Sequence, residues 1–274
     1  MNSGLLSPSV SSERAEEIEA PESTRQGLRS RALAPRPRLP QSSCRMRTLF
    51  PSSPEKYEEE LRRGLKWTGE NRRYFAARRI FWLRKRLVEE GGSAPRSILD
   101  FGCGLGDALE LFGRWPEVER LVGADADPRM LARARKTLSD PRARFIPPEA
   151  LPALAPFDLV YLNGVLHHIP PPDRPPLARR LAALLAPGGA LAVWENNPWN
   201  PGTRWVMRRT PFDRDAAPLG AAQTRCLAEA AGLRVARTDY LFLFPRALRF
   251  FRPIEPALAS LPLGGQYLVL ARRP

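Results

Sequence analysis

The segment ILDFGCGLGD, residues 98–107, concentrates glycine and aspartate where an apolar run ends. Asp100 closes the run, Gly102, Gly104 and Gly106 follow at alternate positions, and a helical pattern begins. Glycine lets a backbone turn sharply and approach a ligand closely, while the next helix offers unpaired N–H groups. The spacing G-x-G-x-G is neither the G-x-G-x-x-G of dinucleotide-binding turns nor the G-x-x-x-x-G-K-[ST] of phosphate loops. The segment predicts a turn that binds a nucleoside-containing ligand.

A second carboxylate lies about twenty residues further on, in LVGADADPRML. Asp125 ends the second apolar run, where a carboxylate can accept protons from both ribose hydroxyls. The alternative role is to cap the helix that follows, but Asp127 before Pro128 suits that role better. We therefore predict that Asp125 binds ribose and that Asp127 caps the helix.

Polar residues also follow the fourth and fifth apolar runs: Asn163, Gly164, His167 and His168 after the fourth, and Glu195 after the fifth. Ligands of open α/β sheets bind beyond these carboxyl ends. A histidine that titrates near neutrality could take a proton from an acceptor, or the pair could fix the start of a loop. Glu195 is a base, a substrate hydrogen-bond acceptor or a brace for the next loop. These two histidines and Glu195 are the candidate catalytic residues.

Metal centres and disulfides are poorly supported by the composition. The chain has only two histidines, and its cysteines, Cys44, Cys103 and Cys226, are far apart. That pattern fits neither a disulfide framework nor a paired metal-ligand spacing. Glu195 lacks the further carboxylates that a divalent ion would need. We predict no metal.

Alternating strand and helix patterns would position these residues. Short apolar runs predict strands at 97–101, 120–125, 143–146, 157–163 and 190–195, and helical patterns separate them at 107–114, 128–138 and 174–186. A helix near 219–231 precedes two further strands at 233–243 and 266–272. This alternation predicts an α/β fold with a doubly wound, mostly parallel, seven-stranded sheet and helices on both faces.

The order of four segments resembles class I S-adenosylmethionine-dependent methyltransferases, including quinone-biosynthesis types, over about residues 95–195. The segments are ILDFGCGLGD, GADADPRML, FDLVYLNGVLHHIP and LLAPGGALAVWE. The resemblance implies S-adenosylmethionine as cofactor. Its methionine part would contact the turn of Gly102, Cys103, Gly104 and Gly106, with Asp100 supporting the amino group. Asp125 and Ala126 would lie by the ribose, and Asn163 and Gly164 along the cofactor.

Two features set the chain apart within that resemblance. Many relatives carry an acidic residue after the third strand that binds adenine, but here the segment reads FIPPEALP. Either Glu149 replaces it, or backbone and apolar contacts hold the adenine. The segments TGENRRYFAARRIFWL, ENNPWNPGTRWVMRRTPFDRDA and LPLGGQYLVLARR resemble a less characterised branch of such enzymes.

Composition divides the chain into three parts. The first is rich in Ser, Pro, Arg and Glu and is expected to be disordered, because it has little to bury. We expect a disordered extension at 1–45, an N-terminal helical lid at 46–94, where Tyr74 and Phe75 fold over the site, and a methyltransferase domain at 95–274 with substrate-side insertions at 196–218 and 244–264.

The charge of +14 raises the question of an anionic partner. Between residues 61 and 96, eleven Lys and Arg face three Glu. A helix is predicted from Glu70 to Glu90, with apolar residues at helical spacing: Ala76, Ile80, Leu83 and Leu87. Its basic face could meet an anionic membrane or RNA, but we favour a helix docked on the core with a solvated basic face.

The expected function is methyl transfer to a small molecule that is hydrophobic, quinone-like or lipid-linked. An aromatic tract at 240–244, with Phe250, Phe251 and Ile254, could line an acceptor pocket or touch a membrane, although core packing is favoured for most of it. The alternatives are an RNA methyltransferase, for which no RNA-binding module is evident, and a non-catalytic cofactor-binding protein. No run of about 18 apolar residues and no signal pattern appears, so we expect a cytoplasmic protein.

Overall fold

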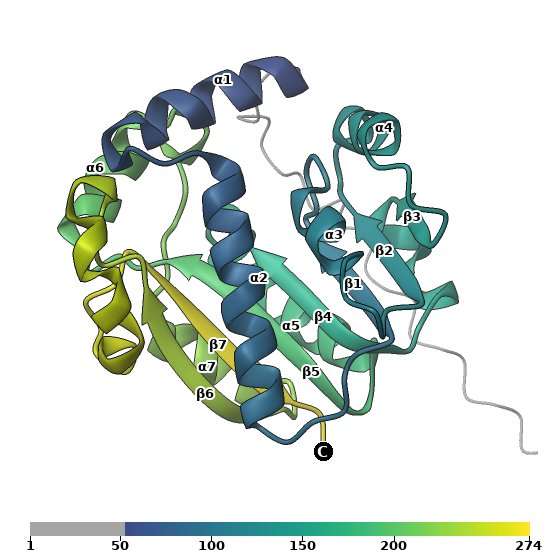
Figure 1. Cartoon of the computed structure of the whole chain (residues 1–274). Coiled ribbons are helices and arrows are strands. Elements are labelled where there is room, and N and C mark those ends of the chain that lie inside the picture. The colour runs from purple at the N-terminus through teal and green to yellow at the C-terminus, as the bar shows by residue number, and fades with distance from the viewer. Residues whose placement is uncertain (1–52) are drawn as a thin grey trace, which may run out of the picture. The chain divides into compact units, whose positions relative to one another are not determined.

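The computed structural model describes residues 53–274, so the expected disordered extension at 1–45 lies outside the described residues. Seven strands form one sheet in the order β3-β2-β1-β4-β5-β7-β6 (Figure 1). Only β7 runs antiparallel to its two neighbours among these strands. The doubly wound, mostly parallel sheet is therefore confirmed. The strands are β1 Ser97–Phe101, β2 Arg120–Ala124, β3 Ala143–Ile146, β4 Phe157–Asn163, β5 Leu185–Asn196, β6 Arg234–Leu241 and β7 Gln266–Arg272.

Helices cover both faces of the sheet, because successive strand residues point to opposite sides. Ile98 packs with residues of α2, α3 and α4, whereas Leu99 packs with residues of α5 and α7. Within residues 53–274 no helix is both long and apolar enough to cross a bilayer. The α-helices are α1 Pro54–Leu65, α2 Arg72–Glu89, α3 Asp107–Phe112, α4 Pro128–Thr137, α5 Arg174–Ala183, α6 Pro201–Arg209 and α7 Ala221–Ala230. The 3-10 helices are η1 Lys66–Thr68, η2 Pro148–Ala153, η3 Leu166–His168, η4 Pro171–Asp173, η5 Pro211–Asp213 and η6 Arg246–Leu258.

Helix α2 lies across the face of the sheet (Figure 1) and buries the predicted apolar stripe of Ala76, Ile80, Leu83 and Leu87. Docking on the core is confirmed. The basic face is less solvated than expected, because two arginines are buried as well. Arg86 donates from Nε to Asp239 Oδ2 at 2.6 Å, and Trp82 Nε1 donates to the same oxygen at 2.8 Å.

The helix predicted at 174–186 is too long. Helix α5 ends at Ala183, and β5 begins at Leu185, which is in register with Phe157 of β4. The segment Pro187-Gly188-Gly189 therefore lies inside the strand. A Cβ on Gly189 would lie 2.8 Å from the Ala186 carbonyl oxygen and 3.1 Å from that of Phe157. Glycine thus lets the chain pass closely against β4, and strand pairing ends the helix early.

The aromatic tract divides between core and surface. Leu241 is fully buried, and Tyr240 and Phe242 are half-buried beside the core. Core packing is wrong for Phe250, Phe251 and Ile254, which are 66%, 43% and 50% exposed. These three residues belong to η6, in which only Glu255 is buried. The apolar side chains of η6 are therefore largely a surface feature.

Candidate functional site

The glycine turn joins β1 to α3. Gly102, Gly104 and Gly106 have φ angles of 77°, 50° and 83°, in the left-handed region that favours glycine. The N–H groups of Gly102 and Cys103 both donate to the Ala124 carbonyl, at 2.7 and 3.1 Å, which ties the turn to β2. A Cβ on Gly104 would meet no described atom within 4 Å. The turn is thus hydrogen-bonded to the end of β2 on one side, and at Gly104 it leaves space in which a ligand could lie.

Asp125 follows β2 and holds the tip of this turn. Its Oδ2 accepts the Gly104 N–H at 2.9 Å, and its Oδ1 accepts the Asp127 N–H at 2.9 Å. Asp127 in turn accepts the Arg129 N–H at 2.8 Å as the N-cap of α4, which confirms that part of the prediction. Burial raises the pKa of Asp125, and the backbone hydrogen bonds oppose that rise. Each carboxylate oxygen has a further lone pair for a ligand hydroxyl.

Asp100 is buried at the end of β1 with other carboxylates nearby. Burial, followed by the charges of Asp125 and Asp107, raises the pKa of Asp100 to about 8, while Arg79 opposes the rise. Burial also raises the pKa of Asp107 against the opposing charge of Arg72. Three carboxylates with raised pKa values favour a cationic ligand. S-Adenosylmethionine carries an ammonium and a sulfonium, so the residues fit the cofactor that the resemblance implies.

Arg79 of α2 is a site residue that the sequence analysis missed. It is 8% exposed and donates from Nη1 to Gln266 Oε1, a neutral amide oxygen, at 2.9 Å, and its charge acts on the pKa of Asp100 and of Tyr161. Its Nε has no hydrogen-bond partner in residues 53–274. A buried guanidinium with an unpartnered N–H can bind a carboxylate well. Arg79 lies three residues after Ala76, on the apolar face of the predicted helix, and this position could have predicted that it is buried.

The candidate catalytic residues meet at the carboxyl ends of β4 and β5. Glu195 Oε1 accepts the Leu166 N–H at 2.6 Å, and Oε2 lies 2.5 Å from His167 Nδ1. The Nε2 atoms of His167 and His168 lie 3.4 and 3.5 Å from Asp213 Oδ1. Asp213 comes from η5, in the TPFDRDA segment, and the sequence analysis did not identify it. The predicted trio is thus one cluster with an added carboxylate.

Charge separates the two histidines of this cluster. Burial alone would lower the pKa of His167, but Glu195 and Asp213 outweigh it and raise the pKa to about 10. Burial and then the charge of His167 lower the pKa of His168 to about 4. The His167 cation also lowers the pKa of Glu195, against the effect of burial. At neutral pH the cluster therefore combines the His167 imidazolium, the neutral His168 imidazole and the Glu195 carboxylate.

The same cluster bears on the prediction of no metal. His167, His168 and Asp213 bring ligand-type atoms within 4.8 Å of one another, and no other such group occurs in the described part of the chain. Because His167 holds its proton tightly, we interpret the cluster as an acid–base group, and the absence of a metal stays a prediction. Cys103 and Cys226 are free thiols, and Cys44 lies outside the described residues.

Asn163 and Gly164 lie between the glycine turn and the histidine cluster. Gly164, at φ 66°, donates its N–H to the Trp194 carbonyl at 2.9 Å, and a Cβ there would lie 3.4 Å from His167 Cε1. Val165, the next residue, packs under the turn, where a Cβ on Gly102 would come within 2.5 Å of its Cγ2. The predicted cofactor residues therefore run continuously from β1 to β4.

Tyr57 of α1 links the carboxylates by the turn to the histidine cluster. Burial, followed by the charges of Asp213, Asp107 and Asp125, raises the pKa of the Tyr57 phenol to about 12. Its ring packs on Phe212 with centroids 4.9 Å apart. The sequence analysis missed Tyr57, because the acidic, polar pattern around it gives no sign of a buried partner.

Contacts from α2 reach both the turn and the C-terminal part of the chain. Arg72 Nη1 lies 2.9 Å from Asp107 Oδ2 at the start of α3. The Phe75 ring packs against Phe242 with centroids 5.0 Å apart, and Arg252 lies over the Tyr74 ring at 4.6 Å. Movement of residues 46–94 as a lid stays a prediction.

Comparison with known proteins identifies the family of the part of the chain that contains the glycine turn and Asp125. A methyltransferase domain family model matches residues 98–189. A trans-aconitate 2-methyltransferase of Methylobacterium nodulans is 36% identical over 48% of this chain and 52% of its own length. A trans-aconitate 2-methyltransferase of Escherichia fergusonii is 31% identical over 65% of this chain and 73% of its own length. The chain spans 52%, 38% and 64% of the length of three relatives of that name, which is about half on average.

Solved structures agree on the fold. An S-adenosylmethionine-dependent methyltransferase from Archaeoglobus fulgidus superposes with a TM-score of 0.55 at 17% identity, over 79% of this chain and 98% of that one. The magnesium protoporphyrin IX methyltransferase of Synechocystis, solved with S-adenosylhomocysteine bound, gives 0.52 at 17% identity, over 79% and 86%. The family model and the relatives match a chain that has the expected glycine turn and carboxylates. The chain therefore belongs to the class I S-adenosylmethionine-dependent methyltransferases.

Proposed function

We propose that the chain transfers the methyl group of S-adenosylmethionine to a small-molecule acceptor that is hydrophobic, quinone-like or lipid-linked. The observation that carries the proposal is the open glycine turn at Gly104, fixed by Asp125 and bordered by buried carboxylates. When bound, the cofactor supplies an electrophilic methyl group. The protein then has to align the acceptor and exclude water, effects that can lower a barrier by about 7–11 kcal/mol.

Each residue of the cofactor half has a proposed contact. Asp125 and Ala126 lie by the ribose, and Asp100 binds the amino group, whose positive charge holds the Asp100 carboxyl ionised. Arg79 binds the methionine carboxylate, because its buried Nε–H has no partner in residues 53–274. Asn163 and Gly164 lie along the cofactor, towards the histidine cluster.

In the histidine cluster, the proton-accepting role is assigned to His168. His167 is an imidazolium at neutral pH, and so has no free lone pair with which to accept a proton, whereas His168 is neutral. Glu195 braces His167 and the start of η3 through its two oxygens. A general base is needed only where the acceptor is a hydroxyl or a protonated amine.

Charge and packing favour an apolar acceptor over a tricarboxylic one, the class that the names of the relatives suggest. Glu195 and Asp213 would repel carboxylates at the cluster. Three arginines of α2 and η6 already have acidic partners: Arg72 pairs with Glu58 and Asp107, Arg78 with Glu255, and Arg252 with Glu70. Rings such as Tyr57, Phe212 and Phe75 provide apolar surface instead. The family likeness is strongest in the cofactor half, which leaves the acceptor free to differ.

The test is incubation of the full chain with radiolabelled S-adenosylmethionine and a cell extract, followed by separation of lipid, RNA, protein and polar small-molecule fractions. We expect label in the organic-solvent fraction. Label in RNA alone, or turnover of trans-aconitate comparable to that of any extract component, would overturn the proposed acceptor class. Cofactor binding without labelling of any fraction would favour a non-catalytic binding protein.

A matched control separates the enzyme from background activity. Asp125→Ala should bind no cofactor and transfer no label, while Asp127→Ala, two residues away, should transfer label normally. Equal labelling by the Asp125→Ala protein would show that a contaminating enzyme is responsible.

A further inference from the structure

Exposed apolar side chains gather on one edge of the molecule. Nine of the eleven large hydrophobic residues exposed in the described part of the chain lie in three segments, at 66–68, 199–205 and 248–263. Trp199, Trp67 and Phe250 are the most exposed of the nine, at 79%, 67% and 66%. Scattered single apolar residues are normal on a protein surface, but such a concentration marks a contact surface.

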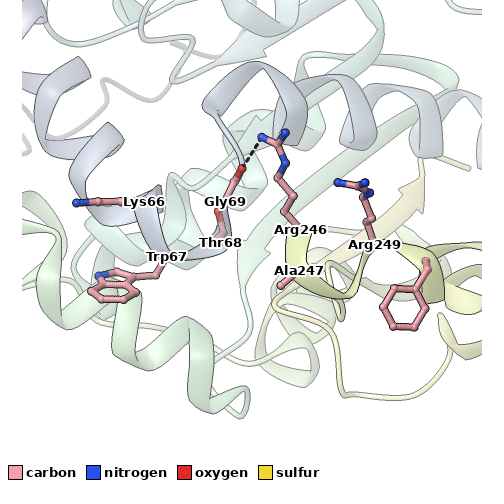
Figure 2. Close-up of a pocket in the computed structure, with 8 residues that line it drawn as sticks. Lys66, Trp67, Thr68, Gly69, Arg246, Ala247 and Arg249 are labelled. Atoms are coloured by element: carbon pink, nitrogen blue, oxygen red, sulfur yellow. Dashed lines mark hydrogen bonds between the residues drawn. The ribbon is translucent and has the colours of Figure 1, made fainter.

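Direct contacts join the three segments into a single surface, here called the apolar edge. Trp67 of η1 packs edge-on against Trp205 of α6, with ring centroids 5.4 Å apart. Asn200, next to Trp199, donates from Nδ2 to the Leu263 carbonyl at 2.8 Å. Arg246 of η6 donates from Nη1 to the carbonyl of Gly69, which follows η1, at 3.3 Å (Figure 2). This bond links η6 to the segment that contains Trp67.

Cations line a hollow within the apolar edge. The hollow measures about 630 Å³ and lies between residues 66–69 and 246–250. Lys66, Arg246 and Arg249 border it together with Trp67 and Phe250 (Figure 2). Basic and aromatic side chains thus border the same opening. Together they can place cations at the depth of lipid phosphates and rings at the interface beneath them.

Exposed carboxylates are missing from the same surface. The stretches 66–69, 199–209, 245–254 and 256–263 contain no Asp or Glu. Glu255, between the last two stretches, is buried and paired with Arg78 at 3.2 Å. Glu70 pairs with Arg252 at 2.9 Å. The exposed charge of the edge is therefore positive, which complements an anionic surface.

We propose that the apolar edge docks on an anionic lipid bilayer, with Trp67 and Phe250 in the interface and Lys66, Arg246 and Arg249 at the phosphates. Aliphatic members such as Ile254, Leu261 and Leu263 gain nothing from a nucleic acid, and they favour a bilayer over RNA. The proposal does not rest on the methyl acceptor, because docking is measurable without turnover. The basic helix α2, which suggested a membrane from sequence, has several arginines paired internally and is not part of the proposed docking surface.

The experiment is flotation of the full chain with phosphatidylcholine vesicles, with and without phosphatidylglycerol. We expect binding to the anionic vesicles only, and weakening as salt rises. Lys66→Glu with Arg249→Glu should reduce the partition coefficient by at least about 20-fold, since each reversal removes an attraction and adds a repulsion. Trp67→Ser with Phe250→Ser should reduce it by at least about 10-fold.

Matched controls use exposed residues away from the edge. Lys136→Glu with Arg225→Glu makes the same charge change on α4 and α7, and Phe81→Ser removes a ring that is 62% exposed on α2. Both should partition within about threefold of the unaltered chain, with unchanged circular dichroism in every variant. No binding by the unaltered chain, equal losses in the controls, or binding to RNA but not to vesicles would overturn the proposal.

Discussion

The cofactor half of the molecule, from β1 to β4, and the acceptor end, from η3 through η6, are built by different means. In the cofactor half the key geometry belongs to the backbone, because three left-handed glycines and the N–H of Gly104 set the turn. At the acceptor end the key geometry is set by side chains from segments that are distant in the sequence. Glu195 of β5, His167 of η3 and Asp213 of η5 meet only after folding.

We expect the two regions to diverge at different rates because of this difference. A backbone turn depends on a short run of adjacent residues, and the matching methyltransferase domain model covers the whole turn. A cluster of side chains from separate loops can be rebuilt whenever one loop changes. The matching family model accordingly ends at residue 189, just before Glu195. We therefore expect variants of the two halves to fail in different ways.

The largest expected effect is on cofactor affinity in the cofactor half. Asp125→Ala removes the proposed acceptor of two ribose hydroxyls and the anchor of the Gly104 N–H, and should weaken cofactor binding at least about 100-fold, or about 2.7 kcal/mol. Isothermal titration calorimetry measures this. Asp127→Ala should instead lower stability by about 1 kcal/mol through the lost N-cap and leave affinity within about threefold. Similar affinities in the two variants would refute the ribose role.

The opposite pattern is expected at the acceptor end. Glu195→Gln removes the nearer of the two carboxylates beside the buried His167 and should lower the free energy of unfolding by about 2–3 kcal/mol, with cofactor affinity within about threefold. Turnover should fall more than binding. Unchanged turnover would remove Glu195 from the active site.

The loss of stability in Glu195→Gln should depend on pH. The pKa of His167 is raised from 6.5 to about 10, so its pairing contributes fully below pH 6.5 and is lost as pH rises through about 10. The pKa of Glu195 is lowered from 4.5, so its share is present above that value. The difference in Tm between the variant and the unaltered chain should therefore be greatest between pH 4.5 and 6.5. A difference that grows towards pH 10 would contradict the ion pair.

The two histidines allow a direct spectroscopic check, because the chain has no others. Their imidazole resonances should titrate far apart, with the pKa of one about 10 and the pKa of the other about 4. Nuclear magnetic resonance of the specifically labelled protein measures both. Two pKa values near 6.5 would mean that the cluster does not form.

The smallest expected effect is the number of protons that the cofactor half releases when the cofactor binds. With a pKa of about 8, Asp100 is mostly protonated at neutral pH, and binding an ammonium should drive that proton off. Calorimetry in buffers of different ionisation enthalpy should show that the unaltered chain releases close to one proton more than Asp100→Asn. Equal proton release would separate Asp100 from the amino group.

The sequence predicted the fold and the cofactor half well, because both depend on local patterns. Four of the strand predictions match the structure residue for residue, at 97–101, 143–146, 157–163 and 266–272. The end of α5 was misplaced, since pairing of Leu185 with Phe157 is a tertiary effect. Arg79, Asp213 and Tyr57 were missed for the same reason, because each acts through a partner far away in the chain.

The central claim is that the glycine turn and Asp125 bind S-adenosylmethionine. Calorimetric titration of the full chain with S-adenosylhomocysteine tests it without any need for an acceptor. We predict saturable binding of one molecule per chain, absent in Asp125→Ala at an unchanged circular dichroism spectrum. Folded protein that gives no binding heat and no shift in Tm with either compound would contradict the account.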